Sequence, residues 1–135
     1  MPPLSVWTIR FSIYYLVQGF TLGALMLINK GLPILPWAWS LLPLHIESVL
    51  FGWTMQFAMG MAFWILPRFA RGQPRGNEAW FVWSFIFLNA GIWISGLAEF
   101  VPYTAWLRIA GRLLELIAFT AFAFQAWQRV KPLGK

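Results

Sequence analysis

The sequence predicts an all-α fold: a four-helix transmembrane bundle that forms a single membrane domain over residues 1–135, with both termini cytoplasmic. Hydrophobic residues make up 60% of the chain and charged residues 10%, whereas a soluble domain carries roughly 25% charged residues. A length of 135 residues leaves room for about four spans of roughly 20 residues each with short connections. The composition therefore excludes an ordinary soluble enzyme, and the abundant aromatic residues exclude a disordered tail.

The apolar runs predict membrane-spanning helices at about residues 7–29, 43–67, 79–100 and 103–128. Each run is long enough to cross a hydrocarbon core about 30 Å thick as a helix. We expect helices rather than strands because lipid offers no partner for backbone polar groups. Prolines and glycines mark the connections between the runs. The fourth run differs from the others because it carries Arg108, Arg112 and Glu115.

Basic residues are concentrated on one side of the predicted bundle. The first connection carries only Lys30, and the third connection carries no basic residue. The second connection and the tail carry the others, namely Arg68, Arg71, Arg75, Arg129, Lys131 and Lys135. By the positive-inside rule, both termini and the second connection are cytoplasmic, as in a bacterial-type inner (plasma) membrane. We assign the net charge of +6 to orientation and to lipid headgroups of the bilayer, and we expect no nucleic-acid partner.

Each predicted span places one polar side chain near the middle of the bilayer: Gln18, Gln56, Asn89 and Glu115. Such groups are costly in lipid unless they are paired or functional. One interpretation is a hydrogen-bonded layer that fixes the register of the helices. The other is a contact for a proton or a quinone head group, with Glu115 as the titratable member.

Arginines near the outer end of the fourth span need acidic partners or a ligand. Arg108 and Arg112 are four residues apart and share a helix face, with Glu115 three residues further on. An ion pair of Glu47 with Arg108 or Arg112 would allow these charges to stay in the membrane. Alternatively, the two arginines hold an anion, such as the propionates of a haem.

His45 is the single histidine of the chain and lies near the outer end of the second span. Helical spacing places Gly52, Gln56 and Gly60 on the same face as His45. A flat macrocycle requires this combination, an axial nitrogen followed by small residues that let the ring approach the backbone. The sequence therefore predicts His45 as a ligand of haem iron above a glycine-lined groove. The alternative is a histidine that is hydrogen-bonded at the membrane interface.

Residues 43–69 carry a recognisable pattern, made up of Pro43, His45, Phe51-Gly52-Trp53, Gln56-Phe57, Gly60, Trp64 and Pro67-Arg68. This pattern resembles helix II of subunit I of the haem–copper (cytochrome c) oxidases, in which a histidine near the outer end ligates the low-spin haem. The resemblance implies that His45 binds a b-type haem. It also implies a respiratory-chain role, in electron transfer or sensing, or as an accessory partner of a larger haem-protein complex.

The chain departs from that family in its ligands. A second axial histidine and the histidines of an oxygen-reducing centre are missing, so oxygen reduction by this chain alone is excluded. A sixth ligand would have to be a methionine, with Met26 best placed, a water molecule, or the His45 of a second copy in a homodimer. The alternative function is a non-catalytic structural or assembly subunit without a cofactor. A transporter is disfavoured because the spans show no inverted halves.

Overall fold

The computed structural model describes residues 1–69, 75–102 and 105–130, and every regular element within these ranges is helical. In chain order the elements are α1 (Pro3–Gly31), the 3₁₀ turn η1 (Ala38–Leu41), α2 (Leu42–Ile46), the π-helix η2 (Glu47–Met55), α3 (Gln56–Ile65), α4 (Ala79–Leu97), the 3₁₀ turn η3 (Ala98–Phe100) and α5 (Ala105–Trp127). The all-α prediction is therefore confirmed for these residues. Arg71, Lys131 and Lys135, used above to predict orientation, lie outside them, as do the first two residues of the span predicted at 103–128.

Prolines fix several of the helix boundaries. Pro3 is the first residue of α1, where its missing N–H costs no hydrogen bond. At the end of α3, Leu66 adopts an extended backbone conformation, as expected for a residue that precedes a proline. The helix bounds therefore follow local chemistry that is visible in the sequence.

Three helical segments are long and apolar enough to cross a membrane: Pro3–Gly31, Ala38–Ile65 and Ala79–Phe100. They correspond to the first three predicted spans. The fourth, α5, has 23 residues, which is enough for a span by length. Among the described residues, α5 does not count as a candidate membrane span by length and composition. It is the helix that carries the charged residues Arg108, Arg112 and Glu115.

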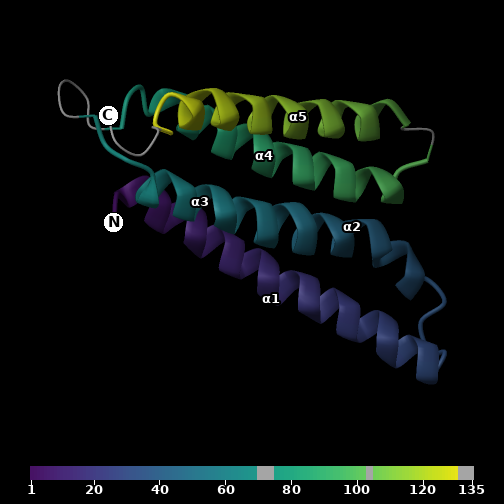
Figure 1. Cartoon of the computed structure of the whole chain (residues 1–135). Coiled ribbons are helices and arrows are strands. Elements are labelled where there is room, and N and C mark those ends of the chain that lie inside the picture. Colours follow the sequence, from purple (N-terminus) through teal and green to yellow (C-terminus); the bar gives the residue numbers. More distant parts are fainter. Residues whose placement is uncertain (70–74, 103–104, 131–135) are drawn as a thin grey trace.

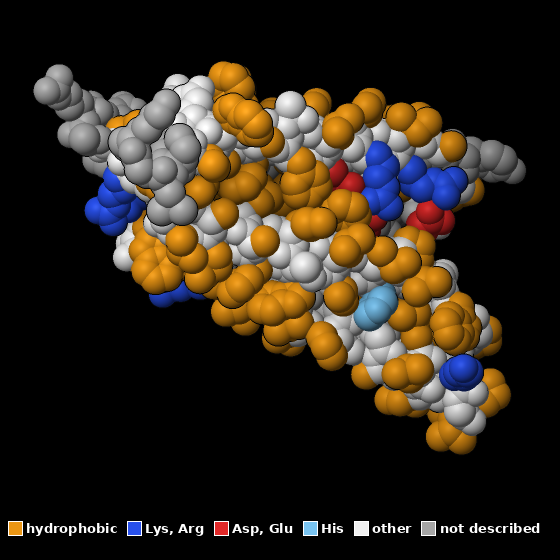
Figure 2. All heavy atoms as spheres, viewed as in Figure 1, with side chains coloured by type: hydrophobic (Ala, Val, Ile, Leu, Met, Phe, Trp, Pro, Cys, Tyr) orange, Lys and Arg blue, Asp and Glu red, His pale blue; other side chains and the backbone are white. Residues whose placement is uncertain are grey.

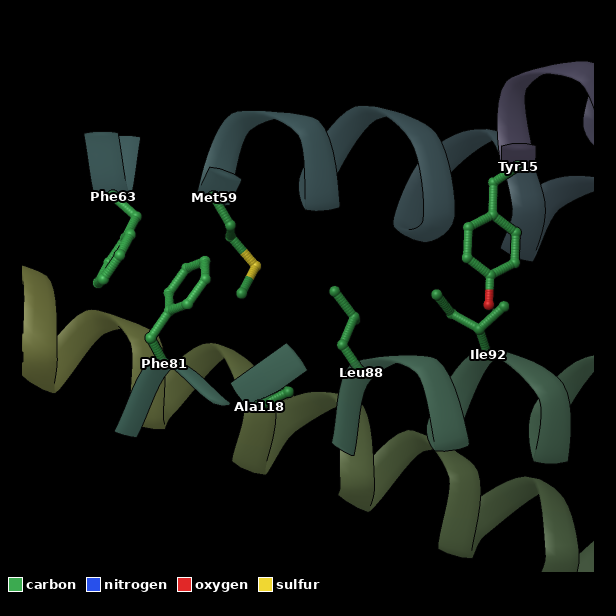
Figure 3. Close-up of a cluster of buried hydrophobic side chains, with 7 residues drawn as sticks. All are labelled: Tyr15, Met59, Phe63, Phe81, Leu88, Ile92 and Ala118. Atoms are coloured by element: carbon green, nitrogen blue, oxygen red, sulfur yellow. The ribbon is translucent and has the colours of Figure 1, made fainter. Parts of the chain in front are cut away.

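The four long helices form two antiparallel hairpins that lie side by side (Figure 1). In the first, α1 packs along the continuous helix α2–η2–α3; in the second, α4 packs along α5. The start of α1 and the end of α5 lie at the same end of the molecule (Figure 1). Side chains from both hairpins meet in the core, as Figure 3 shows for Tyr15, Met59, Phe63, Phe81, Leu88, Ile92 and Ala118.

The exterior of the molecule differs from that of a soluble protein. Large hydrophobic side chains are exposed along all four long helices, and orange covers much of the face in Figure 2. Small polar side chains are buried between the helices: Ser5, Thr8, Ser12, Ser48, Ser84 and Ser95. Small residues at helix contacts and an apolar exterior are typical of proteins surrounded by lipid.

Candidate functional site

The second long helix turns His45 and Glu47 towards different neighbours. His45 contacts α1, and Glu47 contacts α5 on the other side. Glu47 begins η2, a π-helix of 9 residues; π-helical segments are rare, usually a single turn, and frequent at functional sites. Sequence reasoning assumed uniform α-helical spacing through this segment and therefore missed the change of register.

The imidazole of His45 is held by the backbone of α1. Its Nδ1 lies 2.8 Å from the carbonyl oxygen of Gly19. Because a carbonyl can only accept a hydrogen bond, Nδ1 is the donor in this contact. Gly23 makes room for the ring, since a Cβ at this position would lie 2.9 Å from the Cε1 of His45. The Gly19 and Gly23 pair thus serves helix packing within one chain.

A groove between α1 and the outer part of the second long helix opens beside His45, and we call it the His45 groove. Its volume of about 530 Å³ lies within the range of roughly 300–1,000 Å³ that is usual for small-molecule sites. The buried thioether of Met26, 5% exposed, belongs to its lining. The complete lining is Phe20, Gly23, Ala24, Met26, Leu27, Trp39, Leu42, His45 and Val49. The imidazole of His45, the thioether of Met26 and the indole N–H of Trp39 are the polar groups that these side chains can offer a ligand; the other contacts are apolar.

The prediction of an open groove running from His45 past Gly52 and Gly60 is wrong. A Cβ at Gly52 would lie 2.7 Å from the Cδ1 of Tyr15, so the tyrosine ring fills that position. A Cβ at Gly60 would lie 3.1–3.3 Å from side-chain atoms of Ile9 and Thr8. Both glycines therefore allow close approach of α1, because side chains of α1 occupy the space that the sequence pattern left open.

Two of the four predicted midplane groups do meet. The Nδ2 of Asn89 donates to the Oε1 of Gln56 at 2.9 Å, and Gln56 donates to the backbone oxygen of Thr8 at 3.3 Å. Tyr15, which sequence reasoning missed, donates through its hydroxyl to the Oδ1 of Asn89 at 2.9 Å. This network joins α1, α3 and α4. The Oε1 of Gln18 is buried without a hydrogen-bond partner in the described part of the chain, and Glu115 binds elsewhere.

The arginines of α5 have acidic partners. Arg112 donates to the Oε1 of Glu47 at 2.6 Å and to the Oε2 of Glu115 at 3.0 Å, which confirms the expected pairing of Glu47 with one of the two arginines. Arg108 instead donates to Glu99, the acidic residue of η3, at 2.8 Å. Glu99 was missed by the sequence analysis, although it lies near the end of the third predicted span and is readable from the sequence. Figure 2 shows acidic and basic side chains together over the outer half of the α4–α5 hairpin.

The structure therefore separates the six predicted cofactor residues into three places. His45 lines the His45 groove. Gly52, Gln56 and Gly60 lie in contacts between the second long helix and α1 or α4. Arg108 and Arg112 form ion pairs with carboxylates. Of the predicted set, only the imidazole remains available to a ligand in the groove. Comparisons with known proteins find no matching family model, no matching curated protein and no matching solved structure.

Proposed function

We propose that the protein is a multi-pass protein of a bacterial-type inner membrane, with four spans and both termini on the cytoplasmic side. Three apolar helices of spanning length support the proposal. The outward face of α5 is also apolar, with Trp106, Ile109, Leu113, Leu116, Ile117 and Phe124 exposed. The arginines of α5 form ion pairs with glutamates. Arg68, Arg75 and Arg129 lie at the end of the bundle that holds the start of α1, as the positive-inside rule requires.

Within this protein, we propose that His45 is the axial ligand of one b-type haem seated in the His45 groove. The observation that carries the proposal is the hydrogen bond between Nδ1 and the carbonyl of Gly19, which uses one ring nitrogen and leaves Nε2 as the other, on a side chain that lines an apolar groove. Metal-binding histidines almost always donate their other ring N–H in this way, which fixes the tautomer and the ring orientation. The apolar lining of the groove would exclude water from the ligand.

A bound haem would supply one-electron chemistry, for electron transfer, for sensing or within a larger haem-protein complex. Met26 of the same chain could supply a second ligand to the iron, because this residue is buried and lines the same groove. A homodimer that contributes a second His45 is the other source of a ligand. Gly19 positions the imidazole, and Gly23 leaves room for it.

The visible spectrum of protein purified in mild detergent tests this proposal. We expect a sharp α-band of b-type haem on reduction, and its loss in His45→Ala, because the iron loses its axial nitrogen. Met26→Leu is expected to change the band if the thioether is the second ligand. Met55→Leu is the matched control, because Met55 is exposed on η2 and is not part of the groove lining. A chain that folds without pigment, or a band retained in His45→Ala, would refute the haem proposal.

One observation favours a second candidate function, a structural or assembly subunit without a cofactor. Gly52 and Gly60 belong to the pattern that resembles a haem-binding helix. Side chains of α1 lie against both glycines, so these glycines already serve the packing of this chain. The same spectrum separates the two functions. Pigment-free protein that co-purifies with a haem-containing complex would support the structural subunit.

A further inference from the structure

Two glutamates from different helices share one arginine between the two hairpins. Arg112 of α5 donates to Glu47 of η2 at 2.6 Å and to Glu115 of its own helix at 3.0 Å. The carboxylates are almost completely buried, since their side chains are 1% and 3% exposed, whereas the side chain of Arg112 is 52% exposed. We call Glu47 and Glu115 the buried pair.

The charges of this cluster do not balance when both glutamates are ionised. Two carboxylates against one guanidinium leave one uncompensated negative charge in a buried, apolar setting, which is strongly unfavourable. Each carboxyl group also has one buried oxygen to which no described residue donates a hydrogen bond, Oε2 in Glu47 and Oε1 in Glu115. Contact with the same guanidinium brings the two carboxyl groups close together, Glu47 at 2.6 Å and Glu115 at 3.0 Å from nitrogens of Arg112. A single added proton would remove the excess charge and supply the missing donor.

The helices around the cluster offer no other charge that would balance it. α3 and α4 contain no acidic, basic or histidine residue in their sequences, and α1 presents the neutral Tyr15 against Gly52. Arg108 is paired with Glu99 of η3, and His45 of α2 is bonded to Gly19 on the other side of its helix. Arg112 is therefore the cation that the described residues place against both glutamates.

We propose that Glu47 and Glu115 form a proton-binding site, in which the two carboxyl groups share one proton and Arg112 balances the remaining charge. The half-exposed side chain of Arg112 connects the buried pair with the surface. The proton adds to a carboxylate oxygen without any change of oxidation state, so the site needs no further reactant. This proposal stands without a haem at His45.

Infrared spectroscopy of the full-length protein in detergent tests the proposal by counting protonated carboxyl groups near neutral pH. The acidic side chains of the chain are four glutamates, Glu47, Glu78, Glu99 and Glu115, so labelling glutamate with a carbon isotope identifies the carboxyl band. We expect the band of one protonated carboxyl group per native chain. In Glu47→Gln and in Glu115→Gln the band should vanish, because Arg112 alone balances the carboxylate that remains.

Two further variants sharpen the result. Arg112→Gln should raise the number of protonated carboxyl groups from one to two, because neither glutamate then has a cation. Glu99→Gln, which removes the more exposed partner of Arg108, should leave the band unchanged. Absence of the band from the native protein, or its survival in either single glutamate variant, would overturn the proposal. Each variant is first checked for a native helix content and a single monodisperse species.

Discussion

At the scale of single residues, glycines decide how closely α1 approaches the second long helix. The Tyr15 ring lies against Gly52, and the His45 ring lies against Gly23. Neither contact could be predicted from the sequence, because the same glycines suit either a cofactor or a neighbouring helix. Tyr14 and Tyr15 are adjacent and equally plausible as core residues; the packing buries Tyr15 and leaves Tyr14 exposed.

Replacing Gly52 by alanine should therefore destabilise the protein. The added Cβ would lie 2.7–2.8 Å from side-chain atoms of Tyr15, and relief of such overpacking typically costs about 1–3 kcal/mol. Thermal unfolding in detergent should show a lower midpoint for Gly52→Ala than for the native chain. Gly31→Ala is the matched control, because a Cβ at Gly31 meets nothing within 4 Å. An unchanged midpoint in Gly52→Ala would contradict the close contact with Tyr15.

At the scale of elements, the buried side chain of Arg129, just after α5, donates hydrogen bonds to carbonyl groups just after the end of α3. The Nε of Arg129 donates to the carbonyl of Pro67 at 3.1 Å, and its terminal nitrogen donates to the carbonyl of Leu66 at 2.6 Å. Its guanidinium also lies 5.3 Å from the centre of the Phe63 ring. Because carbonyls at the end of a helix have no partner within that helix, Arg129 satisfies two acceptors that would otherwise be left without one.

Arg129→Gln should consequently loosen the contact between the hairpins. Loss of hydrogen bonds from a charged donor to the carbonyls of Leu66 and Pro67 costs about 1.5–3 kcal/mol, so the thermal midpoint in detergent should fall. Arg10→Gln removes an exposed arginine that lies over the Trp7 ring and should have a much smaller effect, which makes it the control for loss of charge. Equal effects of the two substitutions would show that Arg129 acts only through its charge.

At the scale of the whole molecule, the exposed hydrophobic side chains are those of a protein that lies in a bilayer, as we propose. Exposed tryptophans occur towards both ends of the bundle, with Trp7, Trp80 and Trp127 at one end and Trp37, Trp39 and Trp106 at the other. Such aromatic belts mark the two membrane–water interfaces. If α5 crosses the bilayer as the other long helices do, the second connection and the end of α5 lie on the same side.

Cysteine labelling can test this topology directly, because the native chain has no cysteine. In intact cells, a membrane-impermeant thiol reagent should label Ser40→Cys and Val101→Cys, which lie in the outer connections. Asn77→Cys and Gln128→Cys should be labelled only after the membrane is opened. Labelling of Val101→Cys and Gln128→Cys from the same side would instead place α5 on the membrane surface.

The sequence alone was sufficient for the helical fold class, for the positions of three apolar helices and for the pairing of Glu47 with an arginine of α5. These features depend on composition, on proline and glycine positions and on the cost of a charge in an apolar environment, all of which are local or additive. Tertiary structure decided which candidate residues share a site. Side chains of α1 fill the spaces beside Gly52 and Gly60, and Glu47 meets Glu115 at the guanidinium of Arg112, because contacts between helices depend on packing that no single helix specifies.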